Sequence, residues 1–150
     1  MVEEAATDMI SLEQGRGILE PWKQSDFIEK IVQLQKQRQI ETTADEVQFY
    51  DRSPICTLAL SRYLGYLPSD SLLEELQRIE HESIYHRQVF FLDNLGFVQP
   101  TEARKISFEN ALIFQQIHKE VYTELNYELV LIPPEPLSQR AQRIIELTRQ

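Results

Sequence analysis

The sequence predicts an α/β domain with a mostly parallel sheet. Helical and strand-like patterns alternate along its 150 residues, and two short apolar runs each end in an aspartate, Asp51 and Asp93. Alternation of this kind requires strands joined by helical crossovers, which run parallel within one sheet. The composition, 42% hydrophobic and 26% charged residues, predicts one domain over residues 1–150.

The first elements expected are a strand end, a helix and a strand. Residues 1–5 look like the last part of a strand, with carboxylates at its end. Residues 21–39 begin with a proline and carry apolar residues at helical spacing, which predicts an amphipathic helix. Residues 47–50 are apolar enough for a strand that ends at Asp51.

Two helices follow this strand. Ser53 is a suitable N-cap, and Pro54 suits the first helical position of a helix that stops near Gly65. The pattern Ser71-x-x-Glu74 predicts a capping box at the start of the second helix.

The second half of the chain predicts two more strands and two more helices. Residues 88–93 form a continuous apolar run, which is typical of a strand buried on both faces of a parallel sheet. Apolar residues from Phe108 to Leu125 predict a long helix, and residues 127–132 predict a strand. Ser138 is expected to cap a last helix whose inner residues are Ala141, Ile144 and Ile145.

Charge and cysteine content exclude several classes of protein. A net charge of -9 argues against non-specific binding to nucleic acid or to an anionic membrane, because both need a basic surface. No apolar run approaches the roughly 18 residues that a membrane span needs. Cys56 is the single cysteine and no secretory signal is visible, so we expect the reducing cytoplasm and a buried, unreactive thiol.

Acidic residues at the ends of the expected strands point to a ligand site. If the strands run parallel, Asp51 and Asp93 share one rim of the sheet, and Glu3 or Glu4 joins them. Aligned carboxylates can hold Mg²⁺ or accept a proton from an attacking hydroxyl. Arg52 could hold a phosphate or carboxylate. The alternative is that Asp51 caps the following helix and Arg52 makes a surface ion pair.

Residues 94–106 have no clear periodicity and contain Arg104 and Lys105. Between a strand and a long helix, a phosphoryl-transfer fold places a mobile basic lid that neutralises transition-state charge. A solvated loop is an equal alternative.

Zinc and serine chemistry are disfavoured. His81 and His86 are five residues apart, not four as in H-E-x-x-H, so a helix would turn their rings away from each other. Ser53 does not lie in a G-x-S-x-G motif.

The order of these motifs resembles the AAA-domain predicted ATPases of the P-loop kinase-like group, relatives of the nucleoside-kinase-like domain of bacterial NAD regulators. The resemblance covers nearly the whole chain. Its matching features are Glu3-Glu4-Ala5-Ala6, the helix from Phe27 to Gln35, Phe-Tyr-Asp-Arg-Ser-Pro at 49–54, Val-Phe-Phe-Leu-Asp at 89–93, Arg104 before a long helix, Tyr122-x-x-Leu125-x-Tyr127, and Pro133 with Arg140.

The resemblance implies a three-layer P-loop NTPase-like fold that is truncated at its N-terminus. In the family, a first strand and a glycine-rich loop ending in Lys-Ser/Thr come before the part that this chain matches. That strand lies between those corresponding here to Tyr50 and Phe91. No G-x-x-x-x-G-K-[ST] motif occurs in the 150 residues. Because this loop binds the nucleotide phosphates and Mg²⁺, we expect the chain alone to be inactive.

The resemblance also implies residue roles. ATP and Mg²⁺ would be the cofactors, and an unknown small molecule would be the acceptor. Asp51, Arg52 and Arg104 would be catalytic, with Asp51 associated with Mg²⁺. The nucleotide would be contacted by Asp93, Lys105 and Arg140, and the acceptor by Glu4 and Ser53.

Two functions therefore remain open. The first is ATP-dependent phosphoryl transfer or ATP hydrolysis, with the phosphate loop outside this chain. The second is a non-catalytic interaction or regulatory protein on the same scaffold. In both cases an uncovered gap in the sheet leads us to expect a homo-oligomer or a rearranged sheet.

Overall fold

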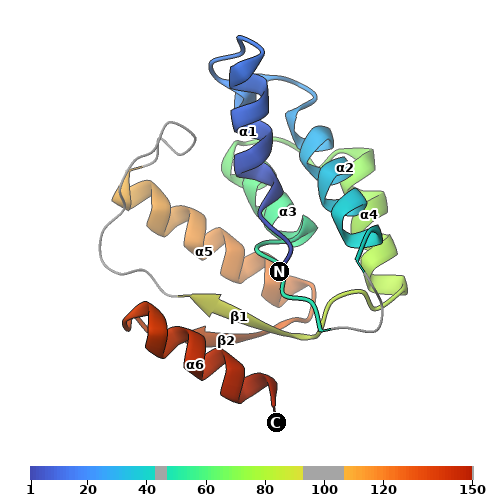
Figure 1. Ribbon diagram of the computed structural model, residues 1–150. Coiled ribbons are helices and arrows are strands. Elements are labelled where there is room, and N and C mark those ends of the chain that lie inside the picture. Colours follow the sequence, from blue (N-terminus) through green and yellow to red (C-terminus); the bar gives the residue numbers. More distant parts are fainter. Residues whose placement is uncertain (43–46, 93–106, 150) are drawn as a thin grey trace. The chain divides into compact units, whose positions relative to one another are not determined.

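The computed structural model describes residues 1–42, 47–92 and 107–149. The predicted mixture of helices and parallel strands is confirmed, although helices dominate (Figure 1). The elements are α1 (Ala5–Gly15), a 3-10 turn η1 (Pro21–Lys23), α2 (Phe27–Ile40), α3 (Pro54–Tyr63), α4 (Asp70–His81), β1 (Gln88–Leu92), α5 (Phe108–Glu124), β2 (Glu128–Ile132) and α6 (Leu137–Thr148).

The described residues fall into two compact units, residues 1–85 and residues 86–149. Within these residues, every helix is too short or too polar to cross a lipid bilayer.

In the first unit, the N-terminal segment pairs in parallel with the segment that precedes α3. Val2 and Tyr50 form an isolated parallel bridge. The Val2 N–H donates to the Phe49 carbonyl (2.7 Å), and the Asp51 N–H donates to the Val2 carbonyl (2.9 Å). The expected pairing of the N-terminal residues is therefore present. The strand predicted over residues 47–50 is reduced to this one bridge, because no further ladder forms there in the described residues.

Helix α2 is the centre of the first unit and contacts α1, α3 and α4. Its inner face is fully buried, with Phe27 1% and Ile31 0% exposed. The predicted start at residue 21 was wrong. Pro21 begins only the short turn η1, and the backbone at Gln24 is extended (ψ 142°), so the α-helix starts at Phe27.

Helix α1 was not expected from the sequence. It buries Ala5, Met9 and Glu13, which are spaced four residues apart on one face. The Glu13 carboxylate is 2% exposed and accepts hydrogen bonds from Lys30 Nζ (3.0 Å) and Arg16 Nη1 (3.2 Å). A charged residue thus occupies a core position because two cations reach it.

Serine side chains cap two helices of this unit. The Ser53 hydroxyl accepts from the Ile55 N–H (3.2 Å), which confirms the predicted cap of α3. The cap of α4 is Ser69, which accepts from the Leu72 N–H (3.2 Å), and not the predicted Ser71. An earlier start places Asp70 in the first turn, where a negative charge is favoured by the helix dipole.

Replacing Ser69 with alanine is expected to cost about 1 kcal/mol of stability, because the Leu72 N–H loses its side-chain acceptor. The matched control is Ser71→Ala in the first turn of α4, two residues after the cap. This change should alter stability by less than about 0.5 kcal/mol. Urea denaturation of both variants measures the difference. Equal losses would mean that neither hydroxyl caps α4.

The second unit contains a two-stranded parallel sheet. β1 and β2 pair in register from Gln88 opposite Glu128 to Leu92 opposite Ile132, so the predicted parallel pairing of these strands is confirmed. Helix α5 connects to β2 and packs on it, and Lys119 of α5 lies over the Phe91 ring (5.4 Å). In Figure 1, α5 and α6 are drawn on opposite sides of the two strands.

Three predictions for the second unit were wrong. The strand β1 is not buried on both faces, since its three central residues are half-buried and its two ends are exposed. Helix α6 buries none of its residues, and Ile145 is 41% exposed. Ser138 lies inside α6, whose N-cap position is occupied by Pro136 without a side-chain cap. The backbone of Pro136 is extended (ψ 147°), so the helix starts at Leu137 and not after Ser138.

Candidate functional site

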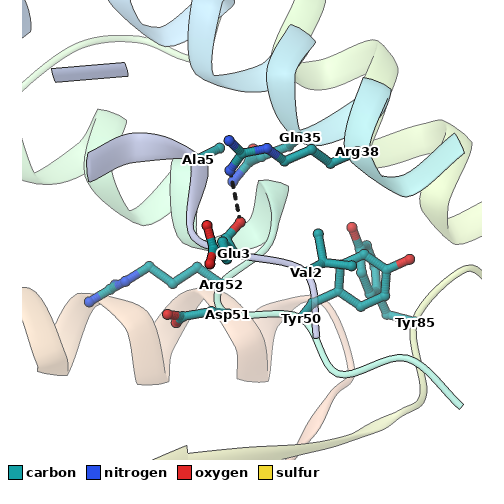
Figure 2. A pocket seen from close by; sticks show the side chains of 9 residues that line it. All are labelled: Val2, Glu3, Ala5, Gln35, Arg38, Tyr50, Asp51, Arg52 and Tyr85. Atoms are coloured by element: carbon teal, nitrogen blue, oxygen red, sulfur yellow. Dashed lines mark hydrogen bonds between the residues drawn. The ribbon is translucent and has the colours of Figure 1, made fainter. Parts of the chain in front are cut away.

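A charged cluster lies where the Val2–Tyr50 bridge ends (Figure 2). Arg52 Nε is 3.3 Å from Glu4 Oε1, and the side chains of Arg52 and Glu4 are 32% and 13% exposed. Asp51 is exposed and lines the same small cavity as Arg52. The two segments that form the bridge therefore bring an acid and a cation together at its end.

The backbone of Arg52 is left-handed, with φ 70°. For a residue with a side chain this conformation is uncommon and costs about 1–3 kcal/mol. Here the turn lets Asp51 complete its backbone bond to Val2 while Ser53, two residues on, caps α3. The strained turn is compensated by these bonds and by the ion pair with Glu4.

Arg38 reaches this cluster from α2, a contact that the sequence analysis did not predict. Its guanidinium donates to the Glu3 carbonyl through Nη1 (3.0 Å) and to Asp8 Oδ2 through Nη2 (2.8 Å). The dashed line in Figure 2 marks the first of these bonds. Arg38 thus ties the N-terminal segment and the first turns of α1 to α2. Arg38 is 35 positions from Glu3 and 30 positions from Asp8 in the sequence, so no local pattern could indicate these contacts.

Two tyrosines form the other side of the site. The rings of Tyr50 and Tyr85 pack edge to face with centroids 5.1 Å apart, and the Tyr50 hydroxyl bonds to Thr42 Oγ1 (3.2 Å). In Figure 2 they lie on one side of Val2, while the Asp51 and Arg52 side chains extend to the other. The cavity that these residues line has a volume of about 10 Å³, whereas small-molecule pockets are about 300 Å³ or larger. The cluster is therefore not a preformed pocket for a small molecule.

Burial raises the pKa of the Tyr85 hydroxyl above its ordinary value, with a smaller contribution from Tyr50. The folded chain therefore binds this proton more tightly than the unfolded chain does. Stability from this group is complete below about pH 10, the ordinary tyrosine value, and falls as the pH rises above it. We expect the difference in absorbance at 295 nm between the parent and Tyr85→Phe to titrate above pH 10. The variant should also lose less stability than the parent in that range. A titration of this absorbance difference with its midpoint at the ordinary tyrosine pKa would contradict the expectation.

The structure brings four of the predicted site residues together, Glu4, Asp51, Arg52 and Ser53. Ser53 is only 6% exposed, and its hydroxyl serves its own helix. Arg140 belongs to the second unit, where its Nε donates to the Pro133 carbonyl (3.0 Å). The remaining predicted residues, Asp93, Arg104 and Lys105, lie outside the described residues.

The described residues do not fit a complete Mg-nucleotide site. Among them, no three His, Cys, Asp or Glu side chains are grouped so that they could hold a metal ion. Arg52, the cation at the strand end, is paired with Glu4. The glycine-rich phosphate loop is absent from the sequence itself. Cys56 is buried, as predicted.

One of three comparisons with known proteins found a match. A search among curated proteins and a search among solved structures found none. The family model described as an AAA domain matches residues 1–140, which is most of the chain. The chain therefore belongs to the AAA domain family, which points to a P-loop NTPase-like fold with nucleotide and metal binding in general.

Proposed function

We propose that this chain is part of a P-loop domain of the kinase-like group, with an ancestral role in ATP-dependent phosphoryl transfer or ATP hydrolysis. We further propose that the first strand and the Walker A loop lie outside the 150 residues, and that these residues alone turn over no ATP. The observation that carries the proposal is the family match over residues 1–140 in a sequence without a G-x-x-x-x-G-K-[ST] motif.

The charged cluster supports an acceptor-side role for the first unit. An acid and a cation at the end of a parallel bridge correspond to the carboxyl end of a sheet, where open α/β sheets bind ligands. In this proposal Asp51 is the acceptor-binding or Mg²⁺-associated acid. Arg52 contacts the acceptor or a phosphate, and Glu4 holds the Arg52 guanidinium in place. The catalytic role of Arg104 and the nucleotide contacts of Asp93, Lys105 and Arg140 are part of the same proposal.

The proposal is tested by isothermal titration of Mg-ATP into the 150-residue chain, with no saturable heat expected at millimolar nucleotide. Tight binding would contradict it, because the described residues and the sequence offer no phosphate loop.

A second test reads the coding sequence upstream of Met1. An in-frame apolar strand followed by G-x-x-x-x-G-K-[ST] is expected, and a chain lengthened by it should bind Mg-ATP. A stop codon directly upstream would count against the proposal.

A non-catalytic interaction or regulatory protein on the same scaffold is the second candidate. It is favoured by the small cavity at the charged cluster and by the pairing of Arg52 with Glu4. It predicts that even a lengthened chain gives no thermal shift with Mg-ATP. For either function we propose the cytoplasm, where Cys56, the single cysteine of the sequence, would stay reduced.

A further inference from the structure

The strand β1 has one edge without a strand partner among the described residues. In a parallel pair, the backbone N–H and C=O groups of successive residues point alternately toward the partner strand and away from it. The Glu128 N–H donates to the Arg87 carbonyl (2.8 Å), so the backbone groups of Arg87 point toward β2. It follows that Val89 and Phe91 direct their backbone groups toward β2. Gln88, Phe90 and Leu92 direct theirs away from β2, to the other edge.

Little at this edge discourages pairing with another strand. The five residues of β1 contain no charge, proline or glycine, and its ends are exposed, with Leu92 53% exposed. Natural edge strands are normally protected by such residues. The outer edge of β2 is better protected, because Glu128 lies at its start and two prolines follow its end. At the β1 edge, the Gln88 N–H donates to a local acceptor, His86 Nδ1 (3.2 Å).

We propose that two copies of the 150-residue chain pair through this edge, with β1 antiparallel to β1 of the second copy about a two-fold axis at Phe90. In this register Phe90 lies opposite Phe90, and Gln88 lies opposite Leu92. The outward backbone groups of these three residues then face one another as hydrogen-bonded pairs, which is the arrangement an antiparallel ladder requires. A two-fold pairing uses the same edge of both copies and closes the assembly as a dimer.

The sheet itself also favours a second copy as the occupant. The sheet has two strands among the described residues, and the pairing extends it to a continuous four-stranded sheet with more backbone hydrogen bonds. The register places Val89 opposite Phe91, a β-branched and aromatic pair of the kind that stabilises antiparallel strands. In a longer chain whose own strand pairs with β1, this edge would be taken, so the dimer is a property of the 150-residue chain.

The dimer is tested by analytical ultracentrifugation of the 150-residue chain and two charge variants. Gln88 and Leu92 are both exposed, so either can carry a charge without disturbing the core. The double variant Q88K/L92K places lysines opposite lysines twice and should raise the dimer dissociation constant by about tenfold or more. The matched variant Q88K/L92E places lysine opposite glutamate in the same register and should keep the parent's dissociation constant or lower it.

Circular dichroism and thermal unfolding establish that both variants are folded, and amide exchange at Phe90 should be slow only in the dimeric samples. A monomeric parent chain at about 100 µM, a range in which weak dimers form, would overturn the proposal. So would a dimer that Q88K/L92K does not weaken, which would place the interface on another surface. Equal weakening by both variants would exclude the antiparallel register. None of these outcomes depends on nucleotide binding.

Discussion

Replacing Phe27 with alanine is expected to lower the free energy of unfolding by about 3–5 kcal/mol, the range found when a buried phenylalanine is truncated. Phe27 is 1% exposed and is the first residue of α2, the helix that contacts α1, α3 and α4. The cavity left by its ring would lie at the centre of the first unit. The other end of α2 carries Arg38, so loosening this helix should also disturb the bonds to Glu3 and Asp8.

The loss can be followed by urea denaturation monitored through the fluorescence of Trp22, the single tryptophan, which lies in η1 beside α2. Leu67→Ala is the matched control in the same unit, because Leu67 is 91% exposed and its removal should cost less than about 0.5 kcal/mol. A loss at Phe27 as small as that at Leu67 would show that α2 does not organise the core of this unit.

Features that depend on a few neighbouring residues could be predicted from the sequence. Ser53 followed by Pro54 combines an N-cap with a proline at the first helical position, and the structure has α3 begin there. The parallel pairing of β1 and β2 followed from two apolar runs separated by a long helical pattern. The sequence also predicted that Glu4 lies close to the segment Asp51-Arg52, because the ends of parallel strands meet at one edge of a sheet.

Features that depend on distant residues could not be predicted. Helix α1 was missed because its buried stripe includes Glu13, which reads as a surface residue until Lys30, 17 positions away, reaches it. Arg38 joined the candidate site through two bonds that span 30 and 35 positions. Helix α6 has a regular amphipathic pattern, but periodicity shows only that one face is apolar. Among the described residues, Ile144 and Leu147 of that face are half-buried and none of its residues is fully buried.

Replacing Arg78 with alanine is expected to cost about 3 kcal/mol, because the carboxylate of Glu75 would remain buried without its main partner. The Glu75 side chain is 4% exposed and accepts two hydrogen bonds from Arg78 Nε (3.2 and 3.0 Å) and one from its Nη2 (2.7 Å). The same Nη2 also donates to Gln39 Oε1 of α2 (2.6 Å), and Nη1 donates to Glu82 Oε2 (3.0 Å). One guanidinium therefore links α4 to α2 and neutralises a buried acid.

Two further variants separate this burial effect from the loss of an ordinary ion pair. Arg143 makes a similar fork to Glu135, with Nη2 at 2.6 Å, but its side chain is 46% exposed, so Arg143→Ala should cost less than about 1 kcal/mol. Arg78→Lys keeps the positive charge and loses the fork, so its loss should fall between those of the two alanine variants. Denaturation of all three under one set of conditions gives the comparison. Equal losses for Arg78→Ala and Arg143→Ala would mean that Glu75 reaches water once Arg78 is removed.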